Sequence, residues 1–147
     1  MASVRPIKVF VDSDVIISSL ISESGAAFAL LYLEEQVDLY ISNFSVIELN
    51  RVVDRLKIES TKLHNVISTR FTTIKINQTD KDVKTKFADY VKDLDDAHIV
   101  AGAKEAQVAF LVSYNTRHFN TEKMREDFQI ILLTPSLFMQ YLRSLSP

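Results

Sequence analysis

Two short runs of mainly apolar residues, at 7–12 and 108–112, do most to limit what this chain of 147 residues can fold into. Runs of this length that are rich in Val, Ile, Leu and Phe are typical of strands buried on both faces of a parallel sheet. The first run ends at Asp12 and the second is followed by Ser113. Because the carboxyl ends of parallel strands lie at one edge of a sheet, these polar residues are expected to be neighbours there.

The rest of the sequence alternates between strand-like and helix-like segments. Further strands are expected at Val37–Ile41, Thr72–Ile76 and Gln129–Leu133. Helices are expected at 13–21, Gly25–Gln36, Asn43–Lys57, Ser60–Arg70, Thr79–Val91, Leu94–Ala106 and Pro135–Leu145. This alternation predicts a three-layer α/β/α fold with a mostly parallel central sheet of about five strands. No linker, repeat or low-complexity stretch divides the chain, so we expect one domain over residues 1–147.

Composition narrows the functional classes. Hydrophobic residues make up 47% of the chain and charged residues 24%, as in globular proteins, and the formal net charge is −2. That charge gives no general attraction to nucleic acid, so a contact with RNA needs a local basic patch. The absence of cysteine excludes disulfides, thiolate catalysis and cysteine-ligated zinc, and is compatible with a cytoplasmic protein. Charged residues interrupt every long apolar stretch, so we expect neither a signal peptide nor a membrane span.

Three acids and one amide fall where this fold would bring them together. Asp12 ends the first strand, and Asn115 follows the strand at 108–112. Glu48 and Asp96 fall in the first turns of expected helices, and helix N-termini lie at the same edge as strand C-termini. Clustered carboxylates repel one another, and a divalent cation relieves that repulsion. We therefore predict that Asp12, Glu48 and Asp96 bind Mg²⁺ or Mn²⁺, which prefer hard oxygen ligands.

The segment Asp12-Ser13-Asp14 allows two interpretations. In the functional one, Asp12 binds a metal while Ser13 and Asp14 support it with hydrogen bonds. In the structural one, an Asp or Ser simply caps the next helix. We favour metal binding for Asp12 and capping for Asp14. Asp93 and Ser113 are the other expected supporting residues.

The other motifs have structural interpretations as well. Ser45 and Glu48 fit a capping box, which taken alone favours a structural role for that Glu. Asp93 fits a helix N-cap, yet the three aspartates within 93–96 exceed what capping requires. Ser113 and Asn115 are common turn residues. The histidines at 64, 98 and 118 lack the spacing of metal ligands, and we expect the one at 98 to be structural.

Taken in order, these segments resemble the PIN-domain family of metal-dependent ribonucleases. The matching segments are Val9–Val15, Val46–Leu49, Asp96–Ala103 and Phe110–Phe119. The resemblance implies an endoribonuclease that depends on Mg²⁺ or Mn²⁺, with RNA as its substrate. It also implies catalytic roles for Asp12, Glu48, Asp96 and Asn115. Many bacterial and archaeal members are toxins of the VapC type, so the resemblance further implies an antitoxin partner, and it is compatible with a homodimer.

One residue departs from the family pattern. The fourth motif usually carries an Asp where this chain has Asn115, which offers a carbonyl oxygen but no negative charge. The number of bound ions, one or two, therefore stays open. Contacts with the RNA backbone are assigned to four basic residues, Arg51, Arg55, Arg117 and Lys123.

Two alternatives to a ribonuclease remain open at this point. The first is a PIN-fold protein with weakened catalysis that binds RNA or another protein. The second is a haloacid-dehalogenase-like phosphatase, because Asp12-Ser13-Asp14-Val15 also fits an Asp-x-Asp motif after a strand.

Overall fold

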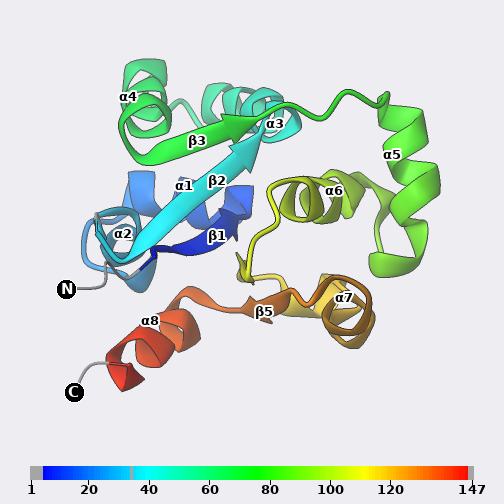
Figure 1. Cartoon of the computed structure of the whole chain (residues 1–147). Coiled ribbons are helices and arrows are strands. Elements are labelled where there is room, and N and C mark those ends of the chain that lie inside the picture. The colour runs from blue at the N-terminus through cyan, green and yellow to red at the C-terminus, as the bar shows by residue number, and fades with distance from the viewer. Residues whose placement is uncertain (1–4, 34, 146–147) are drawn as a thin grey trace.

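The computed structural model describes residues 5–33 and 35–145, which form a layered α/β structure (Figure 1). Its centre is a five-stranded sheet in the order β3-β2-β1-β4-β5. All neighbouring strands are parallel. The strands are β1 (Ile7–Val11), β2 (Val37–Ser42), β3 (Phe71–Ile74), β4 (Phe110–Val112) and β5 (Ile131–Leu133). The predicted α/β fold with a parallel sheet of this size is confirmed.

Helices cover both faces of the sheet. One face carries α1 (Ser13–Ile21), α2 (Ala26–Leu31), α3 (Asn43–Arg55), α4 (Ser60–Arg70) and α8 (Pro135–Ser144). The other carries α5 (Asp80–Phe87), α6 (Ala97–Glu105) and α7 (Thr121–Phe128). Short 3₁₀ helices η1 (Ala88–Tyr90), η2 (Leu94–Asp96) and η3 (Thr116–His118) lie in the connections. Within the described ranges, no helix combines the length and the hydrophobicity that a membrane crossing requires.

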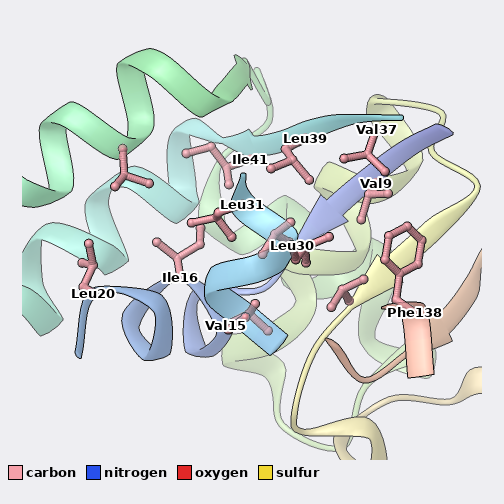
Figure 2. Packing of buried hydrophobic residues seen from close by; sticks show 14 of the residues in the cluster. Val9, Val15, Ile16, Leu20, Leu30, Leu31, Val37, Leu39, Ile41 and Phe138 are labelled. Atoms are coloured by element: carbon pink, nitrogen blue, oxygen red, sulfur yellow. The ribbon is translucent and has the colours of Figure 1, made fainter. Parts of the chain in front are cut away.

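Alternate residues of β1 point into two separate cores. Val9 and Val11 belong to the core under α1–α4, whereas Phe10 belongs to the core under α5–α7. Figure 2 shows the first core, in which side chains of α1 and α2 pack against β1 and β2. These three side chains are fully buried because helices cover both faces of the sheet, and β2 and β4 flank the strand on either side. Asp12, the residue that follows β1, therefore lies at the middle of the carboxyl edge of the sheet.

Most expected elements are present, and the differences lie mainly at their ends. The expected helices at 13–21 and 60–70 have the bounds of α1 and α4. The expected helix Leu94–Ala106 is divided into η2 and α6, and the expected helix Thr79–Val91 changes to η1 after Phe87. The expected helix Gly25–Gln36 ends at Leu31, and residue 34 of that segment lies outside the described residues. Helix α7 was not expected at all, and β5 starts at Ile131 instead of Gln129.

Candidate active site

The ends of β1 and β4 form the centre of the candidate site. The two strands are neighbours, with Val11 opposite Val112. The backbone N–H of Asp12 extends the pairing by donating to the carbonyl oxygen of Val112 at 3.0 Å. From this pair the chain builds β2 and β3 on one side and β5 on the other. Ligands of open α/β sheets bind at such a switch point, beyond the carboxyl ends of the strands.

Asp12 is buried at this point, with an exposed fraction of 6%. Its Oδ1 accepts a hydrogen bond from the Ser13 N–H at 2.7 Å, and its Oδ2 accepts one from the Ser113 hydroxyl, also at 2.7 Å. Asp12 is thereby the N-cap of α1, so the predicted capping role for Asp14 is wrong. The reason is that the residue after β1 keeps the extended backbone that an N-cap needs, with φ −69° and ψ 151°.

The carboxyl group of Asp12 titrates far from its usual range. Burial and, to a smaller extent, the neighbouring charges of Asp14, Glu48 and Asp96 together raise its pKa to about 8, although the hydrogen bond from Ser113 opposes the rise. A carboxylate that is both buried and close to other acids gains strongly from a cation. The three acids expected at the site are therefore near enough to repel one another, although they come from distant parts of the sequence.

Asp14 turns toward the loop after β4. Its Oδ2 accepts a hydrogen bond from the Tyr114 N–H at 3.0 Å and lies 3.4 Å from the Ser113 hydroxyl, whose proton points to Asp12. Burial raises the pKa of Asp14, while the nearby backbone N–H groups of Tyr114 and Val15 oppose the rise. Its other oxygen, Oδ1, is buried and has no hydrogen-bond partner among the described residues. Asp14 therefore holds the β4 loop against α1 and leaves one carboxylate oxygen unsatisfied.

Glu48 lies beyond the first turn of α3, which is further into the helix than expected. The N-cap of α3 is Ser42, whose hydroxyl accepts from the Ser45 N–H at 3.2 Å. The predicted capping box of Ser45 and Glu48 is therefore wrong, because β2 passes directly into a helix that starts at Asn43. The Glu48 side chain is thus free for other contacts, and its Oε2 lies 3.3 Å from Nε2 of His98.

Local partners decide the charge of Glu48. Burial raises its pKa, but the His98 ring, the Ser13 hydroxyl and Arg51 together lower it below the usual value. The Ser13 hydroxyl falls short of a hydrogen bond and is itself a buried group without a partner in the described part of the chain. Glu48 is therefore the acid of this group that remains ionised most readily.

Asp96 lies at the junction of η2 and α6. It occupies the N-cap position of α6 without a side-chain capping bond, and its Oδ2 lies 3.4 Å from Nδ1 of His118. Burial and the charge of Asp93 raise the pKa of Asp96, and His118 opposes the rise. Asp93 is an N-cap as expected, but of η2, where its Oδ1 accepts from the Asp95 N–H at 2.9 Å.

Sequence reasoning missed both histidines that contact these acids. His98 lies within Ala97–Ala103, a stretch in which every residue is buried. A polar ring in such a helix signals a buried partner, and that signal was available in the sequence. His118 gave no comparable signal, because its contact with Asp96 depends on the conformation of η3.

Asn115 contacts the cluster through its backbone. Its N–H donates to the Ser113 hydroxyl oxygen at 3.0 Å, and the residue as a whole is exposed. The residue thus lies next to Ser113 at the edge of the acidic cluster.

The four expected RNA contacts differ in position. Arg51 lies one turn beyond Glu48 on α3, and Arg117 is exposed in η3. Arg55 is two turns from Glu48, about 10 Å along the helix, so its helix carries it away from the cluster. Lys123 pairs with Asp127 on its own helix at 3.3 Å. Arg51 and Arg117 therefore remain the better placed of the four.

A groove of about 480 Å³ opens beside Glu48. It is lined by Asn43, Phe44, Ile47, Glu48, Arg51, Asp80, Lys84, Asp95 and His98. Asp12 and Asp96 are not part of its wall. The acids were expected to share a single cleft, but they form a buried cluster with this groove beside it. Glu48 and His98 lie where the two meet.

The residues fit a cation that keeps much of its water. Within residues 5–33 and 35–145, no three Asp, Glu or His side chains are grouped closely enough to hold one ion between them. Mg²⁺ retains several waters and commonly binds through one or two carboxylates. The unpartnered Ser13 hydroxyl and Asp14 Oδ1 offer polar contacts to such an ion or its waters. The donor set is therefore suited to a hydrated divalent cation, not to a closed cage of carboxylates.

Solved structures of low sequence identity share this fold. VapBC2 from Rickettsia felis, bound to a DNA fragment from their promoter, has a TM-score of 0.63 at 17% identity, covering 87% of this chain and 98% of that one. VapC20 from Mycobacterium tuberculosis, a sarcin–ricin loop cleaving toxin, has a TM-score of 0.50 at 13% identity, covering 82% and 95%. No curated protein matches the sequence.

The sequence itself matches the family model of the PIN domain over residues 8–117. The matched segment starts in β1 and ends in η3, so it contains Asp12, Glu48, Asp96 and Asn115. This match removes the haloacid-dehalogenase-like phosphatase as an alternative. The chain belongs to the PIN-domain family.

Proposed function

We propose that this chain is an endoribonuclease that depends on a divalent metal and hydrolyses phosphodiester bonds in RNA. One observation carries the proposal. Asp12 is buried at the switch point of a PIN domain, where burial and the charges of Asp14, Glu48 and Asp96 all disfavour its ionised form. A cation at this position removes that penalty, and PIN-domain nucleases generally use divalent metal ions.

Each acid has a proposed role. Asp12 and Asp96 hold Mg²⁺ or Mn²⁺, and Glu48 joins them directly or through water. A bound ion supplies an activated water and neutralises charge on the scissile phosphate. Ser113 and Asp14 keep Asp12 and the β4 loop in place through the bonds described above. Arg51 and Arg117 are the proposed contacts with the RNA backbone.

The proposed substrate is single-stranded or looped RNA, because an open edge beside a sheet accommodates a flexible strand more readily than a rigid duplex. VapC20, which shares the fold, is named for cleaving the sarcin–ricin loop.

We further propose that the chain is the toxin of a toxin–antitoxin pair, with a small protein antitoxin as partner, and that residues 1–147 form one domain.

The decisive test is a ribonuclease assay with single-stranded, hairpin and duplex RNA. Wild type should cleave in Mg²⁺ or Mn²⁺ and stop when EDTA is added. Asp12→Asn should lose activity, whereas Arg55→Ala, on the same domain but away from the cluster, should keep it. Cleavage that survives EDTA, or that Asp12→Asn retains, contradicts the proposal.

A second candidate is an RNA-binding PIN domain without catalysis. It is favoured by Asn115 in place of the usual fourth Asp and by the lack of a three-ligand group among the described residues. RNA binding that responds neither to Mn²⁺ nor to Asp12→Asn, without any cleavage, would select this candidate over the nuclease.

A further inference from the structure

His98 is a polar ring in an apolar setting. It has an exposed fraction of 8% and lies in the first turn of α6. Its ring stacks on Phe44 of α3, with ring centroids 5.9 Å apart and an interplanar angle of 27°. A buried polar ring is costly unless it is hydrogen bonded. Its Nε2 meets this need at Glu48, while Nδ1 is buried and has no hydrogen-bond partner in the described ranges.

Glu48 has a competing partner on its own helix. Arg51 follows it by one turn, the spacing at which a Glu and an Arg pair along a helix. The Glu48 side chain is 35% exposed, so it has room to turn toward Arg51 and the groove. His98 instead approaches from α6, which packs on the opposite face of the sheet. An ionised carboxylate only accepts hydrogen bonds, so Nε2 of His98 is the donor in this contact.

We propose that His98 is a positioning residue that holds the Glu48 carboxylate toward Asp12 and Asp96 and so sets the affinity of the site for a divalent cation. The inference rests on the proposed function, because it assigns Glu48 to a metal site. Partners that orient metal-binding side chains typically change metal affinity by about 10- to 100-fold when they are removed.

The first test measures Mn²⁺ affinity by calorimetric titration. His98→Leu keeps most of the side-chain volume but removes the donor, and it should weaken binding by about 10-fold or more. His98→Gln returns an N–H group near the position of Nε2 and should restore part of the affinity. In a Glu48→Gln background, His98→Leu should add little further loss, because the two residues act through one contact.

His64→Leu is the matched control. Nε2 of His64 lies 3.2 Å from Oδ1 of Asn50, so this ring also contacts α3, but at an exposed position. The control should leave Mn²⁺ affinity unchanged. Wild-type affinity in His98→Leu, or losses that simply add in the double variant, overturns the proposal.

The conformation of Glu48 gives a readout that needs no metal. In metal-free crystal structures, the wild-type carboxylate should contact His98, and in His98→Leu it should turn toward Arg51. An unmoved Glu48 in that variant overturns the role of His98. Failure of wild type to bind Mn²⁺ contradicts the proposed function instead, so the two failures are distinguishable. If His98→Leu does not fold, His98→Gln takes its place in the titrations and in the crystal structures. It is then measured both alone and together with Glu48→Gln.

Discussion

The Ser113 hydroxyl donates a 2.7 Å hydrogen bond to Oδ2 of Asp12, joining two buried side chains that lie 101 positions apart in the sequence. The two residues follow the neighbouring strands β4 and β1. The same hydroxyl lies 3.4 Å from Asp14 Oδ2 and accepts from the Asn115 N–H at 3.0 Å. One hydroxyl thus connects both acids after β1 with the loop after β4.

Ser113→Ala should destabilise the protein by about 1–3 kcal/mol at neutral pH, because it leaves Oδ2 of the buried Asp12 carboxyl group without its hydrogen-bond partner. The variant should also raise the pKa of Asp12 further, since Ser113 lowers it. Urea denaturation measures the stability. Ser136→Ala, at an exposed position of α8, is the control and should change little. Equal midpoints for the two variants would show that the bond contributes nothing.

Stability without metal should fall as the pH rises from about 4 to about 8. The pKa of Asp12 is raised from 3.8 to about 8 in the folded protein. Between these values the folded state binds more protons than the unfolded state, so the free energy of unfolding decreases with pH. Asp12→Asn removes this titration and should flatten the profile. Denaturation in EDTA at pH 5 and pH 8 checks both, and a wild type that gains stability at pH 8 would contradict the burial of this group.

Mg²⁺ or Mn²⁺ should raise the thermal midpoint of the wild type. An ion that binds only the folded state stabilises it by about 2.7 kcal/mol at a concentration about a hundred times Kd. Asp12→Asn should lose part of this response, yet without metal it should be more stable than wild type at neutral pH, since the buried amide does not need the proton that the Asp12 carboxyl group takes up on folding. Thermal unfolding with EDTA and with each ion measures both effects. An equal metal response in both proteins would place the ion elsewhere.

Asn115→Asp should strengthen the binding of a second ion and leave the first nearly unchanged, because an added carboxylate attracts a divalent ion strongly in a partly desolvated site. Titration with Mn²⁺ measures both steps. Asn120→Asp adds the same charge at an exposed position of the following loop and serves as the control. If the two variants behave alike, or if wild type already binds two ions tightly without RNA, Asn115 does not belong to the site.

Arg51→Ala should weaken RNA binding. It should also lower the slope of log affinity against log salt concentration by about one, the amount that one phosphate contact contributes. Arg55→Ala removes the same charge from the same helix but farther from Glu48, and it should have little effect. Fluorescence anisotropy in an Asp12→Asn background measures binding without cleavage. Equal losses in both variants would indicate a diffuse electrostatic attraction and no specific role for the groove.

The sheet could be predicted because its signals are local. Buried parallel strands such as β1 and β4 are short apolar runs, and the polar residues after them mark the edge of the sheet. Helix α7 lacked such a signal. Met124 is its one buried residue, so no apolar stripe reveals it. It ends at Gln129, which adopts a left-handed backbone with φ 56° where a glycine would have marked the end.

The acidic residues could be placed at one edge, but their partners could not. Topology alone brings Asp12, Glu48 and Asp96 to the carboxyl end of the sheet. The capping assignments depended on where β2 stops, and Ser42 could not be chosen over Ser45 from spacing alone. The contact of His98 with Glu48 joins helices packed on opposite faces of the sheet, and no periodicity within one helix reports such a contact.

Because β1 lies between β2 and β4, the site around Asp12 depends on residues from the later part of the chain. Strand β4 begins only at Phe110, and without it one side of β1 would have no neighbouring strand. Asp12 would then also lack Ser113, its hydrogen-bond partner at Oδ2. A fragment of residues 1–109 should accordingly bind no Mn²⁺ in a titration. The strand order thus makes the site depend on both halves of the chain, and a fragment that ends before β4 lacks one wall of it.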